Sequence, residues 1–270
     1  MIKLFVSDID GTLLISGKKI SARNIQAVQK MVAASITVTI ATGRMYRAAL
    51  PVAKELGVNV PIITYNGALI KSADGEILHS EYLPANLIVD IVNFFEQKNW
   101  YMQSYGNDNL FYPFRNNFSE LYEATQKVQG KEIGWQGMRE NTDKVCKLLG
   151  ITANAKETSE RAEILKAEFG NRINFTKSHP QFIEMMPLNV SKAAAVKILA
   201  EKLGVAKSEV MAIGDSDNDF PMLMAAGQSV AMGNATDEIK AACTFVTSNC
   251  KDDGFADAVE KFVFGGINEQ

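Results

Sequence analysis

The sequence predicts an α/β protein whose core is a doubly wound, Rossmann-like parallel sheet, with a second, α+β domain inserted into it. Two observations carry this prediction. Near both ends of the chain, short apolar runs that stop at polar or glycine residues alternate with segments of helical periodicity, as βαβ units require. Between them, an aromatic-rich stretch from about residue 84 to residue 180 breaks that alternation.

The chain opens with a predicted strand at residues 2–6, whose nearly continuous apolar character is typical of a strand buried on both faces. Ser21 then offers a helix N-cap, and apolar residues recur at helical spacing from residue 25 to residue 32. A β-branched run at residues 36–40 predicts a second strand. This order of strand, helix and strand favours a parallel sheet.

The next segment repeats the pattern. A helix from about residue 45 to residue 56 is expected to stop at Gly57, and residues 61–65 supply a third apolar strand. That strand closes in the turn dipeptide at 66–67, and a hairpin is expected around residues 74–75. The first part of the core therefore ends near residue 83.

Residues 84–183 are predicted to form the inserted α+β domain, in which helical runs alternate with short strands and aromatic residues cluster. After it the core pattern returns. Its predicted elements are a helix capped by Ser191, a strand at 210–213, a helix at 220–226, a strand at 230–232, a helix at 237–242 and a strand at 245–246. The predicted domains are thus 1–83 plus 184–270 for the core and 84–183 for the insertion.

Composition narrows the function. The 270 residues are 47% hydrophobic and 22% charged, which is ordinary for a globular protein with a sizeable core. A net charge of −3 and a pI near 5.6 lack the basic character of a nucleic-acid binder. No apolar run reaches the length of a membrane span, and the N-terminus does not resemble a signal peptide. We therefore expect a cytoplasmic protein that binds neither nucleic acid nor membrane; its oligomeric state cannot be predicted.

Cysteine and histidine offer little chemistry. The three cysteines show no CxxC spacing, so neither a disulfide framework nor a thiolate zinc site is predicted. The two histidines lie in no metal-binding repeat. Carboxylates must therefore carry any chemistry of this chain.

Polar side chains gather where the predicted core strands end. They are Asp8 and Asp10 after the first strand, Thr42, Gly43 and Arg44 after the second, Lys192 at a helix start, and the residues from Asp215 to Asp219 after a later strand. Because ligands bind at the carboxyl ends of strands in such a sheet, an acidic cup with a cationic rim is expected. This cup suits Mg²⁺, which takes oxygen ligands and is commonly shared with a substrate phosphate. Spacing alone does not assign roles to Asp8 and Asp10.

Four segments resemble the four signatures of the haloacid dehalogenase superfamily of phosphohydrolases, in order and spacing over nearly the whole chain. They are Asp8-Ile9-Asp10-Gly11-Thr12-Leu13-Leu14, Thr42-Gly43-Arg44, Lys192 within Asn189-Val190-Ser191-Lys192, and Gly214-Asp215-Ser216-Asp217-Asn218-Asp219. The insertion is similar to the cap of the Cof-type sugar-phosphatase branch, which also carries an Asn-Gly turn like that at Asn66. Many members have glycine around the lysine where this chain has Asn189 and Ala193, a departure that affects loop flexibility but keeps the charge.

The resemblance implies Mg²⁺-dependent hydrolysis of small organic phosphate monoesters, such as sugar phosphates or phosphoglycolate. It implies that Asp8 attacks phosphorus and becomes a transient aspartyl phosphate. Asp10 would protonate the leaving oxygen and later deprotonate water. The cap would close over the core and choose the substrate through residues that the sequence does not identify.

The resemblance also implies a ligand set. Mg²⁺ would be held by the Asp8 carboxylate, the Asp10 backbone carbonyl and Asp215, with support from Asp219. The phosphoryl oxygens would be bound by Thr42, the Gly43 amide, Lys192 and Asn218. Arg44 and Arg47 are further candidates for substrate binding, although arginines near a helix start often pair with surface acids instead.

Other functions stay open. A phosphotransferase or phosphomutase would use the same aspartyl phosphate, and a phosphoacceptor signalling module groups similar residues around Mg²⁺. A catalytically idle binding protein is a further alternative. Taken singly, Asp-Gly-Thr is usually a turn, Lys192 a surface charge, and the segment from Gly214 to Asp219 a solvated loop. Their conjunction at predicted strand ends and a helix start is what favours catalysis.

Overall fold

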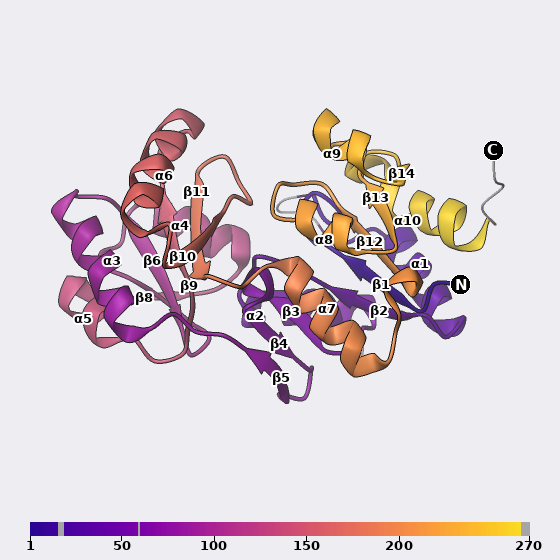
Figure 1. The fold of residues 1–270 in the computed structure, drawn as a ribbon, viewed down its shortest axis with the longest axis horizontal. Coiled ribbons are helices and arrows are strands. Elements are labelled where there is room, and N and C mark those ends of the chain that lie inside the picture. Colours follow the sequence, from indigo (N-terminus) through magenta and orange to yellow (C-terminus); the bar gives the residue numbers. More distant parts are fainter. Residues whose placement is uncertain (16–18, 59, 266–270) are drawn as a thin grey trace. The chain divides into compact units, whose positions relative to one another are not determined.

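A computed structural model describes residues 1–15, 19–58 and 60–265, and the chain divides into two compact units. The first unit comprises Met1–Gly43, Ala49–Leu78 and Ser191–Gln270, and the second comprises Arg44–Ala48 and His79–Val190. Figure 1 colours the chain along its sequence, so the two ends of the chain form the first unit and the middle forms the second. The predicted α/β fold, a parallel core sheet with an inserted α+β cap, is confirmed.

The core sheet has five strands in the order β14-β13-β12-β1-β2, and all its neighbours run parallel. The strands are β1 (Leu4–Ser7), β2 (Thr37–Ile40), β12 (Val210–Gly214), β13 (Gln228–Ala231) and β14 (Phe245–Val246). Leu4 of β1 lies opposite Val210 on one side and Thr37 on the other. The residues that follow β1, β2 and β12 therefore emerge together at one edge of the sheet.

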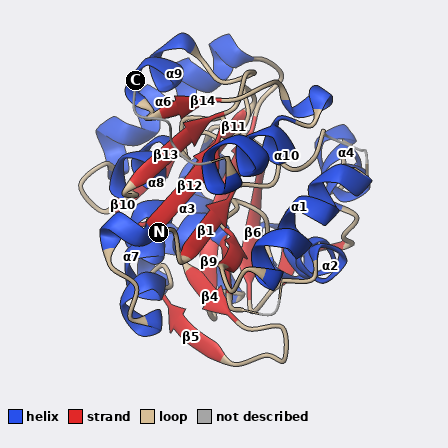
Figure 2. Cartoon of the chain, turned by 90° about the vertical axis from the view of Figure 1, so that its right-hand side faces the viewer, coloured by secondary structure: helices blue, strands red, loops and turns tan. Residues whose placement is uncertain are grey.

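Helices cover both faces of this sheet. Alternate residues of β1 point to opposite faces, and each face packs its own apolar side chains against helices. Phe5 packs edge-on against Phe255, with ring centroids 5.7 Å apart. Leu4 and Val6 instead belong to the apolar cluster that includes Leu199 and Met222. Figure 2 shows α1 (Ala22–Ala33) and α10 (Gly254–Ala258) on one side of the strands, and α7 (Lys192–Leu203) and α8 (Phe220–Ala225) on the other.

The helices of the first unit are α1 (Ala22–Ala33), α7 (Lys192–Leu203), α8 (Phe220–Ala225), α9 (Asp237–Ala242) and α10 (Gly254–Ala258), with α2 (Tyr46–Leu56) shared between the units. Short helical turns lie at Lys207–Glu209, Cys250–Asp252 and Val259–Phe264. The predicted caps are confirmed, because Ser21 accepts a hydrogen bond from the amide of Asn24 and Ser191 from that of Ala194. The chain leaves α7 through Gly204, which has a φ of +66°.

The third predicted core strand is only partly a member of the parallel sheet. Strand β3 (Ile62–Thr64) meets the chain after β2 through a single bridge between Ala41 and Ile63. It otherwise pairs with β4 (Leu69–Lys71) in an antiparallel sheet of order β3-β4-β5, with β5 at Ile77–Ser80. The short turn η1 (Tyr65–Gly67) joins β3 to β4 and brings the chain back so quickly that β3 pairs with its successor.

The second unit is built on a six-stranded sheet of order β10-β11-β9-β6-β7-β8. Its strands are β6 (Met102–Gly106), β7 (Asn109–Tyr112), β8 (Gly130–Glu132), β9 (Val145–Ile151), β10 (Ile173–Thr176) and β11 (Phe182–Pro187). All pairs are antiparallel except β7 with β8. Short connections join β6 to β7 and β10 to β11, which antiparallel pairing permits.

The helices of this unit are α3 (Ala85–Gln97), α4 (Asn117–Gln126), α5 (Gly134–Glu140) and α6 (Ala155–Phe169). One apolar cluster joins α3, α5 and α6 to the sheet, with Phe95, Leu148 and Leu165 among its buried members. The other face of the sheet carries Tyr105, and Tyr122 of α4 lies beside it with ring centroids 6.1 Å apart. The aromatic cluster of the sequence thus contributes largely to packing.

The return to the core comes later than the predicted residue 184. Strand β11 pairs with β9 and β10 of the cap sheet, and the second unit extends to Val190. At the other boundary the first unit ends at Leu78, within β5. The alternating pattern of residues 182–186 suits either sheet, so only the pairing partner decides which unit receives this strand.

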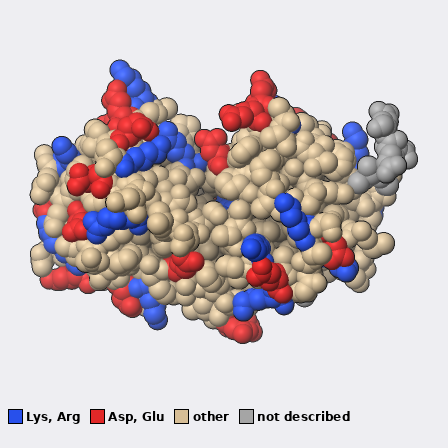
Figure 3. All heavy atoms as spheres, in the orientation of Figure 1, with Lys and Arg blue, Asp and Glu red and all other residues tan. Residues whose placement is uncertain are grey.

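Charges of both signs are mixed on the face of the molecule drawn in Figure 3. Among the residues that the structure describes, no helix combines the length and apolar character needed to cross a membrane.

Candidate active site

Asp8 directly follows β1, which lies between β12 and β2 in the core sheet, and is 4% exposed. Its backbone amide still donates to the carbonyl of Ile213, at 3.1 Å, so the position continues the pairing of β1 with β12. Asp10 follows in a tight turn in which the Gly11 amide donates to the Leu14 carbonyl at 2.8 Å. Asp10 is half-buried and forms an isolated bridge with Leu14 across this turn.

Gly11 allows the loop after β1 to approach the loop after β12 closely. Its φ is +86°, and a Cβ at this position would lie 2.3 Å from Oδ2 of Asp215. Only glycine combines that conformation with that space. The next residue, Thr12, donates its hydroxyl to Oδ1 of Asp215 at 3.1 Å. The turn after β1 is thereby joined to the loop after β12.

Lys192 joins two further acids. Its Nζ lies 2.6 Å from Oδ1 of Asp8 and 2.6 Å from Oδ1 of Asp219, and its side chain is fully buried. Burial lowers the pKa of an ammonium, but the charges of Asp219 and Asp8 outweigh it and raise the pKa of Lys192. Lys192 therefore stays protonated in the interior and supplies a fixed positive charge to Asp8.

Asp219 organises the loop that follows β12. Its Oδ2 accepts from the backbone amides of Asp215 and Ser216, each at 3.0 Å, and from the Ser216 hydroxyl at 3.1 Å. Gly214 permits this packing, because a Cβ there would lie 2.6 Å from that of Asp219. Both oxygens of Asp219 are thus engaged by protein donors, and the side chain is structural support for the site.

The carboxylates of Asp8, Asp215 and Asp219 converge, each with one oxygen within 4.8 Å of the others. Burial, and then the charge of Asp219, raise the pKa of Asp8 well above its usual range. The same two causes raise the pKa of Asp215 to about 7. Such a group of hard oxygen donors fits a divalent cation, whose charge would let both acids ionise together.

Thr42 continues β2 and is 1% exposed. Its backbone amide donates to the Ile63 carbonyl at 3.0 Å, and its own carbonyl accepts from the Asn66 amide at 2.9 Å. Gly43 follows at the end of this segment of the core unit and is half-buried. The predicted motif that begins at Thr42 therefore follows β2, the strand that pairs with β1 and so lies beside the strand that Asp8 follows.

Asn218 is buried and faces another asparagine. Its Nδ2 donates to Oδ1 of Asn66 at 3.0 Å, and its Oδ1 accepts from the Ser216 hydroxyl at 2.6 Å. Asn66 has a φ of +55° and lies beside Gly67, where a Cβ would be 2.4 Å from the Ser191 carbonyl. The Asn-Gly turn thus packs against the start of the helix that carries Lys192.

The two arginine candidates fall in the second unit. Arg44 is half-buried, and the exposed Arg47 pairs with Asp108 at 3.8 Å and donates to Asn109 Oδ1 at 3.1 Å. Arg47 therefore pairs with a surface acid, which was the alternative to substrate binding for these arginines. Binding of substrate by Arg44 stays a prediction.

Sequence reasoning missed two asparagines. Asn66 was expected only as part of a turn, and Asn234 was not considered, although Asn234 donates to Asp215 Oδ2 at 3.1 Å. Asn234 follows β13 by three residues, so the strand-end rule that found Asp8 and Asp215 could have found it. The contact of Asn66 with Asn218 could not be found this way, because Asn66 lies in the turn between β3 and β4 and not after a strand of the parallel core sheet.

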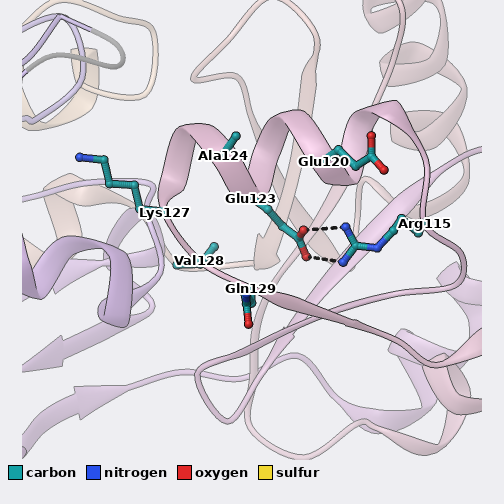
Figure 4. A pocket seen from close by; sticks show the side chains of 7 residues that line it. All are labelled: Arg115, Glu120, Glu123, Ala124, Lys127, Val128 and Gln129. Carbon is teal, nitrogen blue, oxygen red and sulfur yellow. Dashed lines mark hydrogen bonds and ion pairs between the residues drawn. The ribbon is translucent and has the colours of Figure 1, made fainter.

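A separate hollow lies on the second unit around α4 (Figure 4). It is lined by Arg115, Glu120, Glu123, Ala124, Lys127, Val128 and Gln129. Arg115 and Glu123 face each other in two parallel hydrogen bonds of 2.9 and 3.2 Å. Because these charges satisfy each other, the hollow offers no arrangement comparable to that around Asp8.

Comparison with known proteins agrees with this geometry. The chain matches the haloacid dehalogenase-like hydrolase family over residues 5–259. A phosphatase of Bacillus subtilis is 30% identical over 280 residues, covering 94% of this chain and 97% of the relative. A second protein of that organism, 5-amino-6-(5-phospho-D-ribitylamino)uracil phosphatase, is 30% identical over 263 residues, covering 97% and 96%.

Solved structures show the same likeness. A crystal structure from Thermotoga maritima is 30% identical with a TM-score of 0.84, covering 97% of each chain. A haloacid dehalogenase-like hydrolase from Bacteroides thetaiotaomicron is 29% identical with a TM-score of 0.87, covering 97% of this chain and 99% of that one. With sequence, fold and acidic cluster in agreement, the chain belongs to the haloacid dehalogenase-like hydrolase family, as a phosphatase of its Cof-type branch with a large inserted cap.

Proposed function

We propose that this phosphatase hydrolyses small organic phosphate monoesters in a Mg²⁺-dependent reaction that passes through an aspartyl phosphate on Asp8. One observation carries the proposal: the Lys192 ammonium lies 2.6 Å from Asp8 at the edge of an acidic cluster. A carboxylate that attacks a phosphate dianion meets charge repulsion, so it requires fixed positive charge beside it.

Mg²⁺ would be held by the carboxylates of Asp8 and Asp215 and by the backbone carbonyl of Asp10. Asp219 would support this site by orienting Lys192 and the loop after β12, since both of its oxygens already accept hydrogen bonds from them. When bound, the ion offsets the repulsion between Asp8 and the phosphate and polarises the phosphoryl oxygens. All these donors are oxygens, which is the ligand chemistry that Mg²⁺ prefers.

In the first half-reaction an oxygen of Asp8 attacks phosphorus, and the bond between phosphorus and the ester oxygen breaks. Asp10, two residues further along a tight turn, gives its proton to that leaving oxygen, so the alcohol departs neutral. The phosphoryl group stays on Asp8 as an acyl phosphate. Lys192 neutralises part of the charge that builds up on the phosphoryl oxygens.

In the second half-reaction Asp10, now ionised, takes a proton from water as the water oxygen attacks phosphorus. The bond between phosphorus and Asp8 breaks, inorganic phosphate is released, and both acids return to their starting protonation states. A single side chain thus serves first as acid and then as base. The position of Asp10 next to Gly11 gives it the turn geometry that this double role needs.

Four groups would bind the phosphoryl oxygens: Thr42, the Gly43 amide, Lys192 and Asn218. Lys192 is the first residue of a twelve-residue helix capped by Ser191, so free backbone amides and the positive end of the helix dipole add to its charge. Asn218 is oriented by Asn66 and Ser216, which fixes the direction of its amide.

The substrate would be a small phosphorylated metabolite, such as a sugar phosphate or a phosphoglycolate-sized acid. Relatives include two uracil-derivative phosphatases of Bacillus subtilis and an HMP-PP phosphatase of Yersinia pestis, the latter 28% identical over 241 residues. These names span different leaving groups, which supports a common phosphate site with a variable cap. Residues of the cap unit would choose among such esters, with Arg44 as one candidate.

The test is phosphate release from a panel of small phosphate esters with Mg²⁺ or EDTA. Asp8→Asn should abolish turnover while the protein stays folded, and Asp10→Asn should lose most activity yet keep the cation through its backbone carbonyl. Asp217→Asn, an exposed acid of the same loop, serves as the matched control and should retain activity. Undiminished hydrolysis by Asp8→Asn would refute the mechanism.

The same panel separates hydrolysis from phosphoryl transfer to a sugar. A phosphatase releases inorganic phosphate in proportion to ester consumed, whereas a phosphomutase accumulates an isomeric sugar phosphate without phosphate release. A phosphoacceptor module would instead retain its aspartyl phosphate without turnover.

A further inference from the structure

We propose that Asn234 is a positioning residue of the cation site, which holds the Asp215 carboxylate and the Gly11 carbonyl in the arrangement that the ion requires. The inference rests on the proposed function, because it assumes that Asp8 and Asp215 bind a divalent cation.

The contacts of Asn234 single it out. Its Nδ2 donates to the carbonyl of Gly11 at 2.9 Å and to Oδ2 of Asp215 at 3.1 Å. Its Oδ1 accepts from the backbone amide of Cys250 at 2.9 Å. One carboxamide therefore contacts three loops, those that follow β1, β12 and β14.

The orientation of the carboxamide is set by the chemistry of its partners. The Cys250 amide can only donate, so it must face the oxygen of Asn234. The Gly11 carbonyl can only accept, so it must face the NH₂ group. The two hydrogens of that group are then divided between the Gly11 carbonyl and the Asp215 carboxylate. A carboxamide rotated by 180° would place its oxygen against the Gly11 carbonyl and the Asp215 carboxylate, both of which can only accept.

This division matters because Gly11 and Asp215 already touch. A Cβ at Gly11 would lie 2.3 Å from Oδ2 of Asp215, the same oxygen to which Asn234 donates. Thr12 holds the other oxygen, Oδ1, at 3.1 Å. Asp215 is thus restrained at both oxygens, one of them by Asn234. Asn234 binds this proposed ligand directly, and through the Gly11 carbonyl it also holds the turn in which the preceding residue, Asp10, offers its carbonyl to the ion.

Backbone hydrogen bonds join the loop after β14 to the segment that carries Asn234. The amide of Gly233 donates to the Ser248 carbonyl at 3.0 Å, and that of Thr247 donates to the Ala231 carbonyl at 3.0 Å. Asn249, next to Cys250, caps the turn at Cys250–Asp252 by accepting from the amide of Lys251. Asn249 orders the same loop, yet within the described part of the chain the hydrogen bonds of its side chain involve neither Gly11 nor Asp215. It is therefore a matched control.

The experiment measures binding of Mn²⁺ to the full-length protein by the loss of the free-ion EPR signal, without substrate. Groups that orient metal ligands typically change affinity by about 10- to 100-fold when removed. We expect Asn234→Ala to weaken Mn²⁺ binding by at least about tenfold on that basis. Asn234→Leu, which keeps the volume and removes the donors, should show the same loss, and Asn249→Ala should bind like wild type. Circular dichroism establishes that each variant is folded.

A second readout is the dependence of turnover on Mg²⁺. Asn234→Ala should raise the Mg²⁺ concentration needed for half-maximal activity, while kcat at saturating Mg²⁺ falls much less. Wild-type affinity in both Asn234 variants, or an equal loss in Asn249→Ala, would overturn the inference. Asp215→Ala separates the two levels of the argument. If it binds Mn²⁺ like wild type, the proposed cation site itself fails; if it loses binding while Asn234→Ala does not, only the role of Asn234 fails.

Discussion

The ammonium of Lys192 lies 2.6 Å from Oδ1 of Asp219, and neither residue is more than 1% exposed. Asp219 in turn accepts hydrogen bonds from the amides of Asp215 and Ser216, so one buried ion pair connects the third motif to the loop of the fourth. Because Lys192 also contacts Asp8, its charge lies beside both the proposed nucleophile and the acid that orders the loop after β12.

Replacement of this lysine should therefore impair catalysis strongly. Lys192→Met removes the fixed charge beside Asp8, and we expect kcat/KM to fall by about 10²- to 10³-fold, as for other lost transition-state contacts. Steady-state kinetics on any turned-over ester provide the measurement. Lys197→Met, on the same helix with a side chain 77% exposed, is the control and should be nearly silent. Equal rates for both variants would argue against a role for the ammonium.

Gly11 and Gly57 allow the effect of steric contact to be separated from that of backbone strain. Both have positive φ, +86° and +75°, but a Cβ at Gly57 would meet no atom within 4 Å. Gly57→Ala should cost about 1–2 kcal/mol in the free energy of unfolding and leave activity intact. Gly11→Ala should in addition push Asp215 from its place and abolish Mg²⁺-dependent turnover. Urea unfolding and phosphate release measure the two effects, and an active Gly11→Ala enzyme would contradict this account.

Removal of the cation should make stability depend on pH. Without it, burial and neighbouring acids raise the pKa of Asp8 and bring that of Asp215 to about 7, against about 4 in an unfolded chain. Between these values the folded state holds protons that the unfolded state has lost, so stability falls as pH rises, by about 1.4 kcal/mol per pH unit for each excess proton. The EDTA-treated protein should therefore have a lower Tm at pH 8 than at pH 5.5.

Mg²⁺ should reverse this trend, because it binds the ionised acids. The increase in Tm on adding Mg²⁺ is expected to be larger at pH 8 than at pH 5.5, and calorimetry at the two pH values measures it. Asp215→Asn, which removes one of the titrating groups, should flatten the pH dependence of the metal-free protein. An identical Mg²⁺ effect at both pH values would be inconsistent with the raised pKa values.

The cap unit holds its own buried ion pair, between Lys147 and Glu184 at 2.7 Å, with exposures of 2% and 1%. Glu184→Leu leaves an ammonium buried without its carboxylate and should cost about 3–5 kcal/mol. The double variant Lys147→Met with Glu184→Leu should recover most of that loss, since both charges of the pair are then removed. Urea unfolding of the three proteins tests this. A double variant as unstable as the single one would show that the pair is not the cause.

Much of the site was predictable because it depends on strand ends. A parallel sheet brings the residues after its strands to one edge, so apolar runs that stop at Asp8 and Asp215 predict their proximity without further information. The Ser191 cap likewise predicted that Lys192 begins a helix. The family resemblance added the roles of these residues, which their spacing did not supply.

Contacts between distant polar side chains were not predictable in this way. The partner of Asn218 is Asn66, and Asn234 reaches Gly11 from 223 residues away. Strand β11 also entered the cap sheet, because its alternating pattern suits more than one partner. Such choices depend on which surfaces the folded chain brings within about 3 Å, the range of a hydrogen bond.

The sequence by itself determined the α/β class, the inserted cap and the acids and lysine that gather at the strand ends, because periodicity and strand termini are local properties of the chain. Only the tertiary structure decided that Asp219 accepts from its own loop, that Lys192 lies between two carboxylates, and that Asn234 joins three loops. These arrangements arise from the order of strands in the sheet, which brings together side chains whose positions no local pattern relates.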